Sequence, residues 1–242
     1  MNIIKSSKKI DFEAFATFCP EEARILKDIK AAPYTLRVDE LGKIALSQEP
    51  FSPIFIAVAD ILEKHKKFFY KSSIYKDLLA KAIGLKKGKK RPSVLDATAG
   101  LLGDSLLMYS YGLEKLICVE RHPLAAALIT NGLKFSAAKI EFYYGDILNY
   151  CSNLASKPDV IFFDPMYAQK NLKSAPKKEM SIFRHIIGED TDALMVAKKL
   201  RGFTRERLVI KRSNKADSLL GKPDLIHKGK STSYDVYLSI SK

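Results

Sequence analysis

The stretch 158-PDVIFFDPMY-167 decides how the second half of the chain folds. Four apolar residues, Val160 to Phe163, run without alternation into Asp164 and Pro165. A continuous apolar run of this length predicts a strand that is buried on both faces, as in the parallel sheet of an α/β protein. The strand therefore ends by carrying a carboxylate, a rigid ring and a Met-Tyr pair beyond its carboxyl end.

Short apolar runs alternate with helical stretches on both sides of this strand. Such alternation predicts a mostly parallel sheet with helices on both faces, the α/β arrangement of Rossmann-like proteins. The predicted strands are VLD (94–96), KLICVE (115–120), IEFYY (140–144), DVIFFD (159–164) and RLVIK (207–211), followed by two more in the tail.

Residues 1–90 follow a different pattern and predict a small α+β N-terminal domain. Residues 11–29 are helical in pattern, 34–47 alternate around a glycine as a hairpin does, and 53–85 are helical at least in part. The Gly- and Lys-rich stretch GLKKGKKRPS resembles a connector. We therefore expect a second domain over residues 91–242.

The charge balance narrows the class of partner. The 242 residues include 41 Lys and Arg against 27 Asp and Glu, a formal charge of +14, which suits nucleic acid or an anionic membrane. The first ten residues lack the apolar core of a signal peptide, and no apolar segment reaches transmembrane length. Three widely spaced cysteines without a CxxC pair fit a reducing compartment, so we expect a cytoplasmic protein.

Informative residues stand where the predicted strands end, the edge at which open α/β sheets bind ligands. Asp96 ends the first strand, and Gly100 and Gly103 follow in a turn that is either a plain tight turn or a loop that approaches a ligand closely. Glu120 lies 24 positions after Asp96, near the spacing at which an acid reaches a ribose diol, although it could be a surface charge.

The third strand end carries Gly145 and Asp146, and Asp146 suits a helix N-cap as well as a contact beside adenine. The full G-x-G-x-x-G of a dinucleotide site is absent. A sheet with a ribose acid and no pyrophosphate loop suits S-adenosylmethionine (SAM) better than NAD.

The sequence FDPMY resembles the Asp/Asn-Pro-Pro-Tyr motif of methyltransferases that act on conjugated amino groups. The exocyclic amine of a nucleobase is a poor nucleophile because its lone pair is delocalised. Asp164 and the carbonyl of Pro165 could each accept one N–H of such an amine, while the proline ring keeps both acceptors aimed. Tyr167 could stack on the base.

Several motifs together resemble the RsmJ family of SAM-dependent methyltransferases, which modify the N2 of a guanosine in small-subunit (16S) ribosomal RNA. They are VLDATAGLLGDS, VERHPLAAALITNGL, IFFDPMY, KSAPKKEM, GEDTDAL, LVIKR and YDVY. The resemblance covers about residues 35–240 and is strongest over 94–212. It implies a class I, Rossmann-like methyltransferase domain over residues 91–242.

The resemblance implies specific site residues wherever the motifs match. It implies a SAM pocket with Gly103 and Asp104 at the first loop, Glu120 and Arg121 at the ribose strand, Gly145 and Asp146 near adenine, and Asp164 near the methionine end and the target base. Gly103 stands where the family usually has arginine, so that side-chain contact is lost. KSAPKKEM is one residue shorter than the usual form.

Positive charge is concentrated in two stretches. Residues 64–91 hold ten Lys and one Arg against a single Asp, and residues 198–215 hold eight basic residues against Glu206. Such charge suits phosphate contacts. Phe68, Phe69 and Tyr70 lie in the first cluster, where they could bind unpaired RNA or belong to the core. The lysines at 173, 177 and 178, with Lys211 and Arg212, could hold the RNA backbone near a flipped nucleotide.

Other chemistries find less support in the sequence. The four histidines are scattered without metal-ligand spacing, and no G-x-S-x-G elbow is present, so we expect neither a metal nor a serine-hydrolase triad. Two alternatives to the rRNA enzyme stay open: an amino-methyltransferase acting on another RNA or on DNA, and a non-catalytic RNA-binding protein with a SAM fold. The oligomeric state is open as well.

Overall fold

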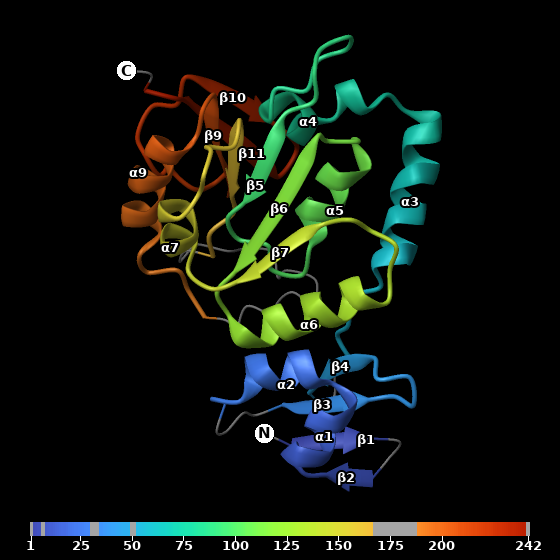
Figure 1. The fold of residues 1–242 in the computed structure, drawn as a ribbon. Helices are drawn as coiled ribbons and strands as arrows, with labels where there is room; N and C mark the ends of the chain where they lie inside the picture. The colour runs from blue at the N-terminus through green and yellow to red at the C-terminus, as the bar shows by residue number, and fades with distance from the viewer. Residues whose placement is uncertain (1, 6–7, 30–33, 49–51, 167–187, 241–242) are drawn as a thin grey trace.

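The computed structural model describes residues 2–5, 8–29, 34–48, 52–166 and 188–240 (Figure 1). Within them, seven strands form a sheet in the order β10-β11-β9-β8-β5-β6-β7. Strands β5 to β9 run parallel, whereas β11 is antiparallel to both of its neighbours. The expected mostly parallel sheet is confirmed. Its strands are β5 (Ser93–Asp96), β6 (Lys115–Glu120), β7 (Glu141–Tyr144), β8 (Val160–Phe163), β9 (Arg207–Ser213), β10 (Leu225–Lys228) and β11 (Thr232–Leu238).

Helices cover both faces of this sheet. One face packs against α5 (Gly103–Ser110) and α6 (Pro123–Lys134), and the other against α7 (Ile147–Ser152) and α9 (Ala193–Phe203). Along β8, Val160 and Phe162 belong to the first core and Ile161 and Phe163 to the second. Both faces of the strand are therefore buried, which explains why its sequence does not alternate.

The first 48 residues form a separate four-stranded sheet in the order β2-β1-β3-β4. The helical stretch 11–29 breaks at Cys19, because Pro20 begins a new helix at the position where a missing N–H costs nothing. The predicted hairpin is present and turns at Gly42, whose φ is +81°. The elements are β1 (Asn2–Lys5), β2 (Lys8–Ile10), α1 (Phe12–Phe18), α2 (Pro20–Leu26), β3 (Thr35–Val38) and β4 (Ile44–Ser47).

The segment that joins the two sheets packs mainly on the large one. Residues 53–57 are not helical, since Ile54 pairs with Leu46, and α3 (Val58–Lys71) begins only at Val58. Helix α3 packs on α5, and after the short turn η1 (Ile74–Lys76), helix α4 (Leu78–Ala82) contacts β10 and β11. The domain boundary near residue 90 stays a prediction. In the described part of the chain, no helix combines the length and apolarity needed to span a membrane.

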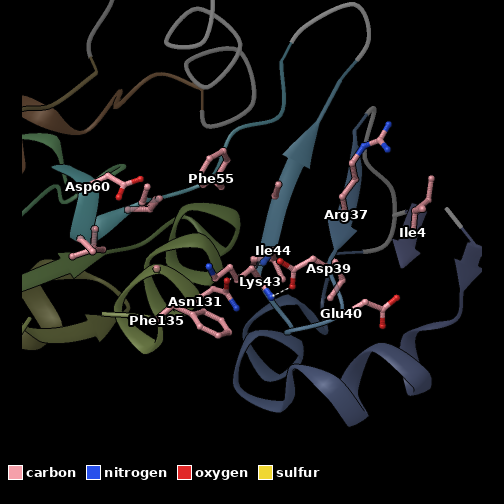
Figure 2. A pocket seen from close by; sticks show the side chains of 17 residues that line it. Ile4, Arg37, Asp39, Glu40, Lys43, Ile44, Phe55, Asp60, Asn131 and Phe135 are labelled. Atoms are coloured by element: carbon pink, nitrogen blue, oxygen red, sulfur yellow. Dashed lines mark hydrogen bonds between the residues drawn. The ribbon is translucent and has the colours of Figure 1, made fainter. Parts of the chain in front are cut away.

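Asn131 of α6 links this helix to the N-terminal sheet. Its Nδ2 donates to Glu22 Oε1 at 2.7 Å and to the Gly42 carbonyl at 2.9 Å, and its Oδ1 accepts the Ile44 N–H at 2.9 Å. Figure 2 shows Asn131 on α6, beside the strand that carries Ile44, at a cavity of about 570 Å³ that both residues line. Next to it, an added Cβ at Gly132 would lie 2.8 Å from the Ile56 carbonyl oxygen, so the 53–57 segment lies flush against α6.

We expect Asn131→Ala to lower the free energy of unfolding by about 2–4 kcal/mol, because it leaves two buried backbone groups and Glu22 without this partner. Urea unfolding followed by circular dichroism would measure the loss. Asn153→Ala, which removes one exposed helix contact to the Asn149 carbonyl, is the matched control and should cost under about 1 kcal/mol. Equal losses for the two variants would contradict the role of Asn131.

Candidate active site

The carboxyl ends of β5, β6 and β8 meet at one edge of the large sheet, because these strands are parallel. A cavity of about 500 Å³ lies at this edge. The sequence predicted eight of the residues that line it, and the structure brings them together. They are Asp96, Gly100, Gly103, Asp104, Glu120, Arg121, Gly145 and Asp164.

Asp96 is buried at the end of β5 and ties that strand to α5. Its Oδ2 accepts the hydroxyl of Ser105, and its Oδ1 accepts the Thr98 N–H at 3.1 Å. Burial raises the pKa of Asp96 to about 7, while these two hydrogen bonds act in the opposite direction. The carboxyl group thus holds the start of the loop between β5 and α5.

Glu120 fixes the same loop from the neighbouring strand. Its two carboxylate oxygens accept the Gly100 N–H at 2.8 Å and the His122 N–H at 2.7 Å. Burial raises the pKa of Glu120 above its usual value, and these N–H groups oppose the rise. Each oxygen has a second lone pair, so the carboxylate can still accept a hydroxyl from the cavity.

The backbone of this loop is unusually curved. Gly100 has a φ of +55°, and Leu102, fully buried before α5, has a φ of +61°. Leu102 is the one non-glycine residue with positive φ in the described ranges. This conformation costs a leucine roughly 1–2 kcal/mol. Burial of the Leu102 side chain offsets that cost and holds the turn in place.

At the third strand end, Gly145 and Asp146 have different roles. Gly145 lines the cavity with a φ of +153° and donates its N–H to the Glu120 carbonyl at 2.9 Å. An added Cβ there would lie 2.6 Å from the ring of Tyr143. Asp146 instead caps α7 by accepting the Asn149 N–H at 2.9 Å, and it is not among the lining residues. The N-cap alternative is therefore what the structure shows, and the contact with adenine stays a prediction.

Asp164 lies at the end of β8, linked to the first loop and to β9. Its N–H donates to Thr98 Oγ1 at 2.7 Å, and its Oδ2 accepts from Lys211 Nζ at 2.9 Å. The same ammonium donates to Asp104 Oδ2 at 2.6 Å. Burial alone would lower the pKa of Lys211, but Asp164 and Asp104 raise it above its usual value. Lys211 therefore stays charged between the two acids.

Met166, directly after Pro165, is held by the turn at residues 190–192. Asp190 Oδ2 accepts the Met166 N–H at 2.6 Å, and its own N–H donates to the Met166 carbonyl at 2.7 Å. The guanidinium of Arg121 binds both Asp190 and Asp192, the latter at 2.7 Å. These three contacts join the motifs VERHP, DPM and GEDTD at one rim of the cavity.

Other predicted residues lie elsewhere or outside the described residues. Pro165 is buried and does not line the cavity. Arg212 points inward and donates to Asp235 at 2.7 Å, and Lys211 is paired as above, so neither is placed as an outward RNA contact. Tyr167 and the lysines at 173, 177 and 178 lie outside the described residues.

Sequence reasoning missed the partners of the site residues: Ser105 binds the carboxyl group of Asp96, Thr98 and Lys211 bind Asp164, and Asp190 and Asp192 bind Arg121. The motifs LVIKR and GEDTD were recognised in the sequence, but only the structure shows which residues their side chains contact. No group of three His, Cys, Asp or Glu side chains suited to a metal occurs among the described residues.

The charge of the cavity suits SAM. Seven described carboxylates line it, against the two cations Arg121 and Lys211. SAM carries a sulfonium and an ammonium, so an acidic cavity within a basic protein favours it electrostatically. With the Glu120 carboxylate able to accept a hydroxyl from the cavity and the glycine loop beside it, the described residues fit this cofactor. The fold and the cavity define the class, a Rossmann-like methyltransferase that uses SAM.

Comparisons with known proteins agree. Residues 25–239 match the sequence model of a family described as "Putative SAM-dependent methyltransferase". The chain is 37% identical to ribosomal RNA small subunit methyltransferase J of Thioalkalivibrio sulfidiphilus over 69% of each chain. It is 33% identical to that of Ectopseudomonas mendocina over 81% of this chain and 78% of the relative. The solved SAM-dependent methyltransferase from Neisseria gonorrhoeae has the same fold, with a TM-score of 0.69 and 24% identity, over 99% of this chain and 96% of that one.

The chain belongs to the SAM-dependent methyltransferase family and, within it, to the group of ribosomal RNA small subunit methyltransferase J.

Asp96 should make stability fall as pH rises. Its folded pKa of about 7 exceeds the usual 3.8, so the folded state holds a proton that the unfolded state has lost between these values. Relative to Asp96→Asn, the wild type should lose at most about 4 kcal/mol of unfolding free energy from pH 4 to pH 8. Urea unfolding at four pH values would measure the difference. Parallel pH profiles for the two proteins would contradict this assignment.

Lys211→Met should reduce the kcat of methyl transfer about 10- to 100-fold and move the acid limb of the pH–rate profile to higher pH. Without the ammonium, the negative charges of Asp104 and Asp164 beside buried Asp96 are no longer offset, and both raise the pKa of Asp96. Lys211→Arg should restore part of the rate, and exposed Lys215→Met should behave as wild type. An unshifted profile would show that Lys211 only supports the fold.

Proposed function

We propose that the protein transfers the methyl group of SAM to the exocyclic N2 of a guanosine in small-subunit (16S) ribosomal RNA. The observation that carries this proposal is the position of Asp164 at the edge of the cavity, at the end of β8. Relatives at 33–40% identity named ribosomal RNA small subunit methyltransferase J support the choice of RNA.

The proposed chemistry is mainly positioning. SAM supplies an electrophilic methyl group on its sulfonium. Asp164 and the Pro165 carbonyl accept the two amine hydrogens of the guanine, which aims the nitrogen lone pair along the line of attack. Lys211 and Thr98 hold Asp164, and Asp190 holds the backbone after Pro165. Tyr167 is proposed to stack on the base.

The cofactor residues are assigned from the same geometry. Glu120 is proposed to accept the ribose hydroxyls, and Gly100 and Gly103 to allow close approach of the chain. Asp104 and Asp164 are proposed to face the methionine end. Asp96 is proposed to act by holding the loop and Arg121 by holding the 190–192 turn. Gly145 is proposed to form the adenine side, with Asp146 next to it as the N-cap of α7.

The proposed partner is ribosomal RNA, free or within a small subunit, and the proposed compartment is the cytoplasm, where ribosomes are made. The domain organisation proposed with it is an N-terminal domain over residues 1–90 and a methyltransferase domain over 91–242.

Transfer of labelled methyl from SAM to naked 16S rRNA and to small subunits, followed by nucleoside analysis, tests the function. N2-methylguanosine is the expected product. No incorporation into either substrate, despite measurable SAM binding, would overturn the rRNA assignment and favour another RNA or DNA.

Asp164→Ala should lower kcat about 100-fold or more while keeping SAM affinity within several-fold, because an acceptor for the amine is lost whereas most of the pocket remains. Isothermal titration would measure SAM binding beside the transfer assay. Asp217→Ala, which changes an exposed carboxylate that does not line the cavity, is the control. Normal turnover in the Asp164 variant would contradict the acceptor mechanism.

A further inference from the structure

Helix α3 has a buried face and an exposed face. On the buried side, the ring of Phe69 lies 5.6 Å from that of Tyr111, and His65 Nδ1 lies 3.3 Å from the Leu106 carbonyl oxygen. Both contacts hold α3 against α5. Phe69 is therefore a core residue, which was one of the two roles that the sequence left open for it.

Phe68 and Tyr70 are different. Their exposed fractions are 59% and 92%, although Phe68 makes an edge contact with Phe69 at 5.1 Å. A tyrosine exposed to this degree buries almost no apolar area and adds little to stability. The two residues are two positions apart and leave the helix on different sides, but both rings line the same shallow hollow. Aromatic side chains left in solvent beside a hollow are typical of a binding surface.

Lysines surround this pair. Lys64, Lys66, Lys67 and Lys71 are all exposed, and Glu63 is the acid beside them, at 3.5 Å from Lys67. We call this surface the α3 face. It encloses a shallow hollow of about 480 Å³ lined by Glu63, Lys66, Lys67, Phe68, Tyr70 and Lys71. Cations that hold phosphates and rings that stack on bases occur together in proteins that bind single-stranded nucleic acid.

The α3 face lies away from the reaction cavity. Helix α5 begins at the cavity with Gly103 and ends near Tyr111, whose hydroxyl donates to Asp77 at 2.7 Å. The contact between Phe69 and Tyr111 therefore places the last turns of α3 at the opposite, amino edge of the sheet, as Figure 1 shows. Eight residues of α5, about 12 Å of helix, separate the two levels.

We propose that the α3 face binds an unpaired segment of the RNA substrate that is distant from the reacting nucleotide. The proposal rests on the proposed function, and it adds a second contact point. Lys66, Lys67 and Lys71 neutralise phosphates, and Phe68 and Tyr70 stack on bases. The contact supplies affinity, while recognition of the target nucleotide stays at the cavity.

RNA fits this surface better than the other polyanion, a lipid bilayer. Two exposed aromatic side chains surrounded by lysines offer little apolar area to insert, whereas membrane-binding helices present a continuous apolar face. The apolar face of α3 is the one packed on α5. Stacking on successive bases needs only isolated rings.

The test compares Phe68→Ala/Tyr70→Ala and Lys66→Glu/Lys67→Glu/Lys71→Glu with wild type in methyl transfer to full-length 16S rRNA. We expect KM for RNA to rise about tenfold or more in both variants, with kcat and SAM affinity unchanged. The lysine variant should also show a weaker salt dependence of RNA binding. With a short hairpin that carries only the target loop, all three proteins should have the same KM.

Lys8→Glu/Lys9→Glu, which reverses two exposed lysines on β2, is the matched control and should keep the wild-type KM. An unchanged KM with full-length rRNA in both α3 variants would overturn the proposal. Loss of binding to phosphatidylserine vesicles without any change in RNA binding would assign the face to membranes and overturn it too. If wild type methylates no rRNA, the proposed function fails, and fluorescence anisotropy with labelled single-stranded RNA still tests the α3 face by itself.

Discussion

The structure depends on two buried carboxylates, Asp96 and Glu120, and on the groups that satisfy them. A buried carboxylate is costly unless it is hydrogen-bonded, and here the partners are backbone N–H groups of Thr98, Gly100 and His122 with the hydroxyl of Ser105. Satisfying both acids fixes the path of the loop between β5 and α5. The loop in turn places Thr98 against Asp164, so the first and last strands of the site are set by one network.

Charge is divided across the molecule. The cavity collects carboxylates although the whole chain is strongly basic, and its two cations are both held in ion pairs. A cationic cofactor and a polyanionic substrate can then be attracted to different surfaces of one small protein. The acidic cavity and the basic α3 face can each keep their own charge, because about the length of α5 separates them.

The sequence predicted the centre of the large sheet well because β5, β6 and β8 are almost wholly buried and each reaches an Asp or Glu at its carboxyl end. It predicted eight lining residues of the cavity for the same reason, since parallel strands bring their carboxyl ends together. It could not predict that Lys211 turns toward Asp164 and Asp104, because an ion pair across 47 or more residues leaves no local pattern. It also included 53–57 in a stretch expected to be helical at least in part, whereas there the pairing of Ile54 with Leu46 overrides the apolar periodicity.

Gly132 helps to set the position of the segment before α3 relative to α6. Because no side chain separates α6 from the segment before α3, that segment lies directly against α6, and β4 of the N-terminal sheet contacts α6 as well. The start of α6 borders the cavity through Pro123, and α3 carries the exposed rings. If the α3 face binds RNA as proposed, the target nucleotide is selected partly by its distance from a second point on the RNA, because packed backbone separates the two surfaces.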